Sequence, residues 1–261
     1  MIFIIAALVS VTAAAPSTRI VAGSEAPANS HPYIGSLQRA TLGIFWSHSC
    51  GCSLIAPSWC LTAAHCVDGA SSSSLRVYLG VHSLSTNENG EQRINVKRVV
   101  MHPNYSGNAA GYPNDIALLE LNSAASITST VKLIDLSPEG ASYEDQDVII
   151  SGWGRTVGGG TLPDKLQQVT MKKISNALCS SMWSSVSGAT INDQHICILD
   201  TVNQKASACN GDSGGPMIIR NDDSDVLIGV TSWGISTCGG DYPSVYTRVS
   251  EYISWINGYI N

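Results

Sequence analysis

A serine set among glycines is the feature that most constrains how this chain can fold. Residues 211–216 read Gly-Asp-Ser-Gly-Gly-Pro, with Ser213 in the third position. Glycine loses more backbone entropy on folding than other residues, so this density indicates a tight turn or a close approach to a ligand. The backbone N–H groups of Gly211 and Ser213 could then converge on one point, as the stabilisation of an oxyanion requires. The plainer interpretation is a glycine-rich turn with an incidental serine.

The spacing Gly-x-Ser-x-Gly over residues 211–215 also matches the nucleophile elbow of the α/β-hydrolases. That fold places its catalytic histidine after the serine in the chain. Here every histidine comes earlier, and the histidines are His31, His48, His65, His82, His102 and His195. The α/β-hydrolase interpretation is therefore excluded, while the orders His–Asp–Ser and Asp–His–Ser both remain open.

Two side chains are candidate partners for this serine. Residues 59–66 predict a strand running into a short helical turn that carries His65, and a disulfide at Cys66 would hold its ring in place. Asp115 stands at the head of the apolar strand expected over residues 116–121. A partly buried carboxylate needs a partner, and histidine is a natural one. A structural histidine and a turn aspartate are the simpler alternatives.

Composition narrows the function classes. The chain has 261 residues, 44% of them apolar, which is enough for one large domain or two small ones. A net charge of −6 argues against nucleic acid as a partner, because phosphate binding needs clustered Lys and Arg. The 24 glycines favour short strands joined by many turns. The eight cysteines lack zinc-ligand spacing, so with an export signal we expect disulfides among Cys50, Cys52, Cys60, Cys66, Cys179, Cys197, Cys209 and Cys238.

The N-terminus predicts export and processing. Residues 1–15 combine a short apolar run with an Ala-Ala-Ala end, which is typical of a secretory signal peptide, and no later segment predicts a membrane anchor. Residues 16–19 form a candidate propeptide that ends at Arg19. Cleavage there would free the amino group of Ile20 to pair with the carboxylate of Asp212, although an ordinary polar tail is the simpler interpretation. Breaking such a buried pair from one side costs about 3–5 kcal/mol.

Other segments predict secondary structure and a modification. Asn104-Tyr105-Ser106 is a glycosylation sequon. Apolar residues recur every three to four positions near the C-terminus, which predicts an amphipathic helix over about residues 248–260. Strands are expected around residues 75–80, 94–101, 116–121, 148–154, 166–174, 217–219 and 226–230.

Six motifs, taken in order, resemble the chymotrypsin/trypsin family of secreted serine endopeptidases from Ile20 to the C-terminus. They are residues 20–23, 61–66, 115–118, 151–154, 211–216 and 232–234. Residues 46–51 and 241–250 further resemble invertebrate digestive enzymes, including annelid fibrinolytic proteases. The resemblance implies an all-β peptidase domain over residues 20–261, with two six-stranded antiparallel β-barrels, about 30–134 and 135–247, and a C-terminal α-helix. No cofactor is implied.

The resemblance also implies catalytic roles. Ser213 would attack the scissile carbonyl, His65 would carry its proton to the leaving amine, and Asp115 would orient the histidine. The amides of Gly211 and Ser213 would bind the oxyanion. Activity should then rise as the imidazole loses its proton, over about pH 6–7.

Further implied roles concern the substrate and the zymogen. Ser232, Trp233 and Gly234 would pair with substrate backbone as an added strand. The pair between Ile20 and Asp212 would form once Arg19 is cut. Partners would be protein or peptide substrates, an activating trypsin-like protease and protein inhibitors, for a secreted protein expected to be a monomer. The rival hypothesis is a non-catalytic homologue acting as a binding adaptor, although such homologues usually lose a triad residue.

For the cysteines, the resemblance implies the bridges Cys50–Cys66, Cys179–Cys197 and Cys209–Cys238. The two remaining cysteines, Cys52 and Cys60, lie on the two arms of one predicted hairpin, and we expect them to pair as well. This would be a departure from the family, in which position 52 usually holds glycine.

Specificity and metal binding depend on a few positions. Ser207 stands where trypsin-like enzymes carry aspartate, Gly234 would leave the pocket mouth open, and Ser244 would make the pocket shallower. These residues predict cleavage after Leu, Met, Phe or Tyr, or an elastase-like breadth. Residues 81–91 match a calcium loop of some family members, but Val81 replaces a usual glutamate ligand, so Glu88 and Glu91 are expected to form no strong metal site.

Overall fold

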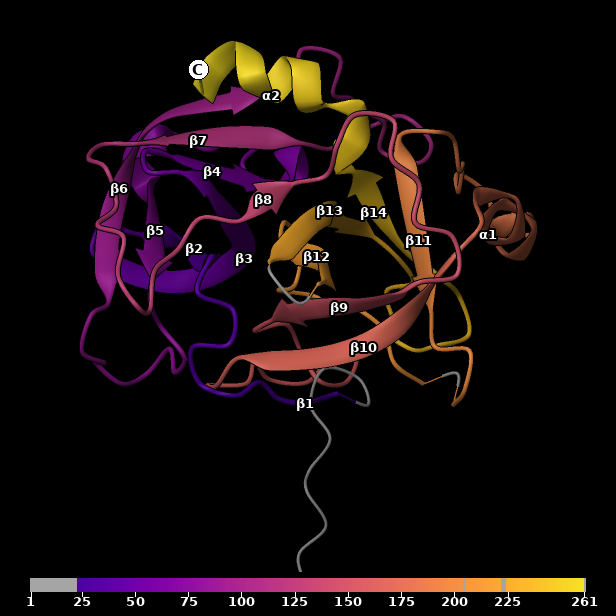
Figure 1. Ribbon diagram of the computed structural model, residues 1–261, viewed down its shortest axis with the longest axis horizontal. Helices are drawn as coiled ribbons and strands as arrows, with labels where there is room; N and C mark the ends of the chain where they lie inside the picture. Colours follow the sequence, from indigo (N-terminus) through magenta and orange to yellow (C-terminus); the bar gives the residue numbers. More distant parts are fainter. Residues whose placement is uncertain (1–22, 204, 222–223, 261) are drawn as a thin grey trace, which may run out of the picture.

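The computed structural model describes residues 23–203, 205–221 and 224–260 (Figure 1). The expected signal peptide (1–15), propeptide (16–19) and new terminus at Ile20 lie outside the described residues. Among the described residues, no helix is long and apolar enough to cross a membrane.

The N-terminal half forms a closed antiparallel barrel. Its strands neighbour one another in the order β2-β3-β4-β7-β6-β5, and β5 closes back onto β2. The strands are β2 (Ile34–Thr41), β3 (Phe45–Ala56), β4 (Trp59–Thr62), β5 (Leu75–Leu79), β6 (Gln92–Met101) and β7 (Ala117–Leu121). A Pro-Ser turn joins β3 to β4, as proline and serine favour.

The C-terminal half forms the second barrel. Its six strands run β9-β10-β11-β14-β13-β12 and close through β12–β9, while β1 (Ser24–Glu25) and β8 (Asp135–Leu136) pair with it from outside. The strands are β9 (Asp147–Gly152), β10 (Gln167–Ile174), β11 (His195–Leu199), β12 (Pro216–Arg220), β13 (Asp225–Trp233) and β14 (Ser244–Arg248). The structure therefore has the all-β, two-barrel architecture that the resemblance implied.

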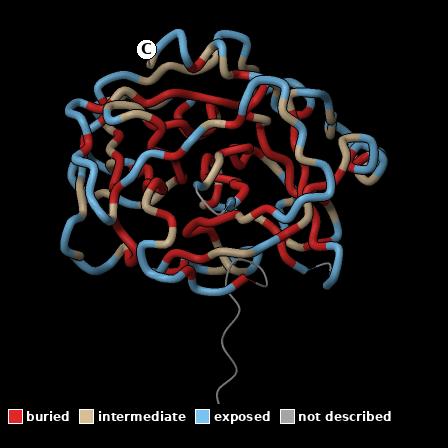
Figure 2. The backbone as a smooth tube through the Cα atoms, in the orientation of Figure 1, coloured by how far each residue is buried: buried red, intermediate tan, exposed pale blue. Residues whose placement is uncertain are grey.

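Buried apolar side chains fill both barrels, and exposed segments lie mainly in the connections (Figure 2). The two halves also share a core, because Trp153 at the end of β9 is fully buried in the cluster that fills the first barrel. This shared packing holds the facing ends of the barrels together, and the segment carrying Ser213 lies there.

Helices are few and short. Helix α1 (Asn176–Trp183) is capped by Ser175, whose hydroxyl accepts a hydrogen bond from the Leu178 amide at 3.1 Å. At the C-terminus, a 3-10 turn, η3 (Val249–Glu251), precedes α2 (Ile253–Ile260), so the helix expected over 248–260 is interrupted at Tyr252. Helix α2 covers the first barrel beside β7 (Figure 1). It buries Ile256 completely.

Three disulfides brace the fold: Cys50–Cys66, Cys179–Cys197 and Cys209–Cys238. They are the pairings that the resemblance implied.

The fourth expected bridge, Cys52–Cys60, is absent, because both residues are free, buried cysteines. The direction of the Cys52 thiol accounts for the difference. Cys60 pairs with Leu54, whereas Cys52 points its sulfur toward the Gly35 carbonyl oxygen of β2, 3.5 Å away. The thiols remain in contact, and the hydrogen bond with Cys52, together with burial, raises the pKa of Cys60.

Buried histidines make folding stability depend on pH. Burial lowers the pKa of His31, His48 and His195. Below the unfolded value of about 6.5, the unfolded chain binds more protons than the folded one, so acid favours unfolding. We predict that the free energy of unfolding of an inactive Ser213→Ala variant falls between pH 7 and pH 5. Denaturant titrations would measure it, and His195→Gln should make the fall less steep. A free energy that rose over this interval would contradict the prediction.

Candidate active site

Strand pairing brings His65 and Asp115 to the same end of the first barrel. Thr62 pairs with Ala117 across β4 and β7, so the turn after β4 and the segment before β7 are neighbours. His65 lies in the 3-10 turn η1 (Ala64–Cys66). Its Nδ1 lies 2.7 Å from Oδ2 of Asp115, and its backbone N–H donates to Oδ1 at 2.9 Å. One carboxylate therefore fixes both the ring and the main chain of the histidine.

Asp115 is almost fully buried, at 1% exposed, and also binds the second barrel. The Ser232 hydroxyl of β13 donates to its Oδ2 at 2.5 Å, and the Thr247 hydroxyl of β14 donates to its backbone carbonyl at 2.7 Å. Buried charge is costly unless it is hydrogen-bonded, and these contacts meet that need. Because Nδ1 of His65 faces the carboxylate, its Nε2 is directed away from it.

The loop that carries Ser213 is anchored to the first barrel. Gly51 of β3 donates its N–H to the Ser213 carbonyl oxygen at 2.7 Å. A Cβ atom on Gly51 would lie 2.7 Å from the Cα of Gly215, so only glycine allows this approach. Gly214 has a φ of 74°, and a Cβ there would lie 2.2 Å from the Thr62 hydroxyl. Glycines on both sides of the junction thus let the two backbones meet.

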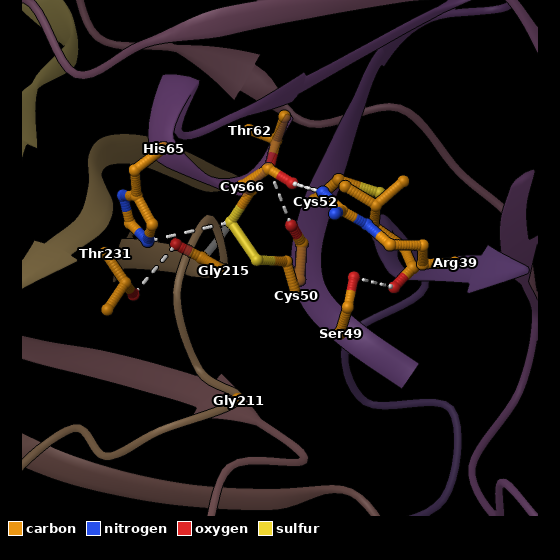
Figure 3. The surroundings of a disulfide bond; sticks show 12 residues. Arg39, Ser49, Cys50, Cys52, Thr62, His65, Cys66, Gly211, Gly215 and Thr231 are labelled. Carbon is orange, nitrogen blue, oxygen red and sulfur yellow. Dashed lines mark hydrogen bonds between the residues drawn. A yellow bond between two sulfur atoms is a disulfide. The ribbon is translucent and has the colours of Figure 1, made fainter. Parts of the chain in front are cut away.

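His65 and Ser213 line one cavity of about 430 Å³. In Figure 3, the Cys50–Cys66 bridge lies between the ring of His65 and strand β3. Nε2 of His65 lies 3.8 Å from the Cys66 sulfur, and no hydrogen bond joins it to Ser213 among the described residues. Catalytic hydrogen bonds often tighten only when substrate binds.

The candidate oxyanion site has free donors. Among the described residues, the N–H groups of Gly211 and Ser213 donate to no other group, whereas Asp212 and Gly214 donate to backbone carbonyls. Gly211 has a φ of 102°. Its carbonyl oxygen accepts a hydrogen bond from Nε2 of His48 at 2.9 Å, which fixes the orientation of this peptide.

His48 is a functional neighbour that sequence reasoning missed. Its Nδ1 lies 2.8 Å from the Ser36 hydroxyl, and burial lowers its pKa, so it is neutral and donates from Nε2. Its ring packs against Trp153 edge-on. A lone histidine in a strand carries no signal of this role. Gly51 was missed as well, because a single glycine in a strand does not reveal which distant backbone it approaches.

Asp212 is buried beneath this loop, at 3% exposed. Its carboxylate accepts hydrogen bonds from the Gly154 and Cys209 amides at 2.8 and 2.9 Å. Burial nevertheless raises the pKa of Asp212 to about 6. Among the described residues, no cation pairs with it. The site thus favours a positively charged partner.

The residues expected to contact substrate fall in two groups. Ser232, Trp233, Gly234 and Ser244 line the cavity together with Tyr112. Ser207 does not line it: this residue is 2% exposed, and its hydroxyl has no hydrogen-bond partner among the described residues. The nearest atom to a Cβ on Gly234 would be 4.0 Å away, so the mouth is open there.

Two groups of possible metal ligands form other bonds within the protein. Ligand atoms of Cys50, His65 and Cys66 lie within 4.8 Å of one another, but both sulfurs belong to a disulfide. In the 81–91 loop, Glu88 accepts hydrogen bonds from the His82 and Ser83 amides. Glu91 accepts one from the Glu88 amide and pairs with Arg93.

Comparisons with known proteins agree with this arrangement. Residues 20–256 match the family model described as Trypsin. A chymotrypsin-like serine proteinase of Haliotis rufescens is 44% identical over 92% of this chain and 91% of that protein. Fibrinolytic enzyme, isozyme C, of Lumbricus rubellus is 41% identical, over 91% of this chain and 98% of that protein. Chymotrypsin-like elastase family member 1 of Macaca fascicularis is 43% identical, over 92% of this chain and 89% of that protein.

The chain therefore belongs to the trypsin family, and it is a serine endopeptidase. Its substrates are proteins or peptides, as the sequence predicted.

We predict that Gly51→Ala disturbs the junction between the barrels. The added methyl would press on the Gly215 backbone and lengthen the hydrogen bond to Ser213, at an expected cost of about 1–3 kcal/mol in unfolding free energy. Denaturant titration and hydrolysis assays would measure both effects. Gly258→Ala in α2, where nothing lies within 4 Å, is the matched control: it should leave hydrolysis unchanged and raise the unfolding free energy by about 0.5–1 kcal/mol, as alanine does in a helix. Equal behaviour of the two variants would contradict this account of Gly51.

Proposed function

We propose that this endopeptidase is secreted as an inactive precursor, is activated by cleavage after Arg19, and cleaves proteins after large apolar residues. The observation that carries the catalytic part is the Asp115 carboxylate, which holds the ring and backbone of His65 at a cavity shared with Ser213. A digestive and a fibrinolytic role would use the same chemistry.

The contacts of Asp115 and the free amides of residues 211 and 213 support a role for each residue. The Asp115 carboxylate accepts a hydrogen bond from the Nδ1–H of His65, and this tautomer leaves the Nε2 lone pair free to take the proton of Ser213. The serine oxygen attacks the substrate carbonyl, and the resulting oxyanion accepts hydrogen bonds from the free N–H groups of Gly211 and Ser213. His65 then passes its proton to the leaving amine, and water hydrolyses the acyl-enzyme by the same route.

Activation would act through Asp212. The Ile20 amino group, freed by cleavage after Arg19, supplies the positive charge that this buried carboxylate lacks among the described residues. Pairing would hold residues 211–213 in the conformation that exposes the oxyanion donors. The activator would itself be a trypsin-like protease, since the cut follows arginine. Protein inhibitors of the same cleft would regulate the monomeric enzyme outside the cell.

The specificity proposal is based on the pocket. Ser207 is buried next to the lining residue Ala208, and it supplies no negative charge behind the cavity wall to attract Lys or Arg. The Ser244 hydroxyl accepts a hydrogen bond from the Ala208 N–H at 3.2 Å. This bond fixes the shape of the cavity wall between the two residues. An apolar side chain is desolvated there without leaving a buried charge unpaired.

Covalent labelling tests the catalytic and zymogen proposals together. We expect a radiolabelled organophosphate to modify Ser213 only after cleavage at Arg19. Arg19→Gln should leave the intact precursor unlabelled by preventing that cut. Ser213→Ala should lose labelling and reduce hydrolysis by on the order of 10⁶-fold. A non-catalytic adaptor predicts no labelling in any form, and labelling of the uncut precursor at the full rate would contradict the activation step.

A panel of peptide nitroanilides tests specificity. We predict that kcat/KM for Leu, Met, Phe or Tyr before the scissile bond exceeds that for Lys or Arg by on the order of 100-fold. Ser207→Asp should raise cleavage after Lys and Arg, and Ser244→Gly should favour the largest side chains. Efficient wild-type cleavage confined to Lys and Arg would overturn the proposal.

A further inference from the structure

The segment directly before Asp115 holds its backbone in an unusual, left-handed conformation. The φ angles are 74° at Gly111, 47° at Tyr112 and 57° at Asn114. Glycine adopts such angles freely, but in other residues they are uncommon and cost free energy, with asparagine among the most tolerant. Strained backbone persists only where surrounding contacts hold it, and it is concentrated at active sites. The segment therefore needs contacts that keep it in this shape.

Asn114 and Gln194, which we call the amide pair, supply such contacts by bonding to each other twice. The Asn114 backbone N–H donates to Oε1 of Gln194 at 3.2 Å, and Nε2 of Gln194 donates to Oδ1 of Asn114 at 3.1 Å. The Tyr252 hydroxyl donates to the same Oδ1 at 3.2 Å, and Nδ2 of Asn114 donates to the Asn104 carbonyl oxygen at 3.0 Å. Asn114 is thus bonded to the second barrel, to the C-terminal segment and to its own loop.

Gln194 is itself fixed at the rim of the second barrel, directly before β11. Its backbone N–H donates to Oδ1 of Asn192 at 3.0 Å, and its carbonyl oxygen accepts a hydrogen bond from the Arg248 N–H at 2.8 Å. The next residue, His195, whose pKa is lowered by burial, donates from Nε2 to the Gly111 carbonyl oxygen at 2.8 Å. The second barrel therefore provides a fixed frame for the left-handed segment.

These bonds hold the chain on both sides of the residue that orients His65. The Thr247 hydroxyl donates to the Asp115 carbonyl oxygen at 2.7 Å, which fixes the peptide after this residue. The amide pair fixes the residue before it, and the Asn114 carbonyl oxygen accepts a hydrogen bond from the Ile116 N–H at 2.8 Å. With the backbone held on both sides, the Cα–Cβ bond of Asp115 has one direction, and its carboxylate lies 2.7 Å from Nδ1 of His65.

We propose that Asn114 and Gln194 are positioning residues for hydrolysis: their paired amides set where the Asp115 carboxylate lies and thereby orient His65. This inference rests on the proposed function, because it assigns the orienting role to Asp115. Neither amide lines the cavity that His65 shares with Ser213, so the pair acts on the rate of the chemical step and not on substrate affinity. A misplacement of about 1 Å in a catalytic group can cost about 100-fold in rate, so a smaller displacement is measurable.

The test separates the side-chain amide from the backbone conformation. Asn114→Gly removes the amide but keeps the left-handed angle accessible, whereas alanine at this position would disturb both. Gln194→Ala removes the partner on the second barrel. Asn29→Gly is the matched control, because Asn29 is exposed and also left-handed, at a φ of 62°. Each variant is assayed as the cleaved enzyme on a peptide nitroanilide, and the rate is divided by the concentration of active sites found by titration.

We expect Asn114→Gly and Gln194→Ala each to lower kcat by about tenfold and to leave KM within about twofold of the wild-type value. The double variant should lose little more than the larger single loss, because both changes break the same pair. In the inactive Ser213→Ala background, the proton NMR signal of the His65 Nδ1–H should move from its downfield position in Asn114→Gly, since that position reports the hydrogen bond to Asp115. The Asn29→Gly control should change neither the rate nor this signal.

A purely structural role for the amide pair predicts a different result. It would lower the free energy of unfolding and leave both kcat per titrated site and the Nδ1–H signal unchanged, and that outcome would overturn the inference. Asp115→Asn tests the proposed function separately. If this variant keeps the wild-type rate, Asp115 does not orient the base and the proposed mechanism is wrong. If it loses activity while Asn114→Gly remains as active as the Asn29→Gly control, only the role of the amide pair is contradicted.

Discussion

The carboxylate of Asp115 is the contact on which the rest of the structure depends. It lies within hydrogen-bond distance of the ring and main chain of His65 from the first barrel and of the Ser232 hydroxyl from the second. Each barrel alone would leave this buried charge incompletely hydrogen-bonded, at a cost of several kcal/mol. The two barrels are therefore held in one relative position by the residue that also orients the catalytic base.

The same junction depends on glycines, whose lack of a side chain lets the two barrels approach each other. A side chain on Gly51 or Gly214 would separate the β3 strand from the serine loop. Buried glycines usually weaken a fold through backbone entropy. Here that cost is offset by backbone hydrogen bonds that cross between the barrels, such as the one from Gly51 to Ser213. Stability and site geometry thus depend on the same contacts.

Much of this could be predicted because the signals are local. The serine loop and the turn before Cys66 are short motifs whose residue types carry their chemistry, and the structure places His65, Asp115 and Ser213 around one junction. Long-range register could not be predicted in the same way. Cys52 and Cys60 lie on adjacent strands with their thiols in contact, yet the Cys52 sulfur is directed to the Gly35 carbonyl oxygen of a third strand and the two remain unbridged. The break at Tyr252 and the role of His48 likewise depend on neighbours that are distant in sequence.

Strand β1 anchors the N-terminal end of the domain, and this anchor sets how far the residues before it can reach. Glu25 pairs with Gln167, which pairs with Gly152, and Gly152 abuts the Asp212 carboxylate. Two strand spacings, about 10 Å, thus separate this anchor from that carboxylate. Four Cα–Cα steps separate position 20 from Ser24, and they can span at most about 14 Å. In the activation that we propose, a chain trimmed two residues too far could span only about 7 Å and would fall short of the carboxylate, and one left longer would have to bury the surplus, so the bond that is cut would decide whether a cleaved molecule becomes active.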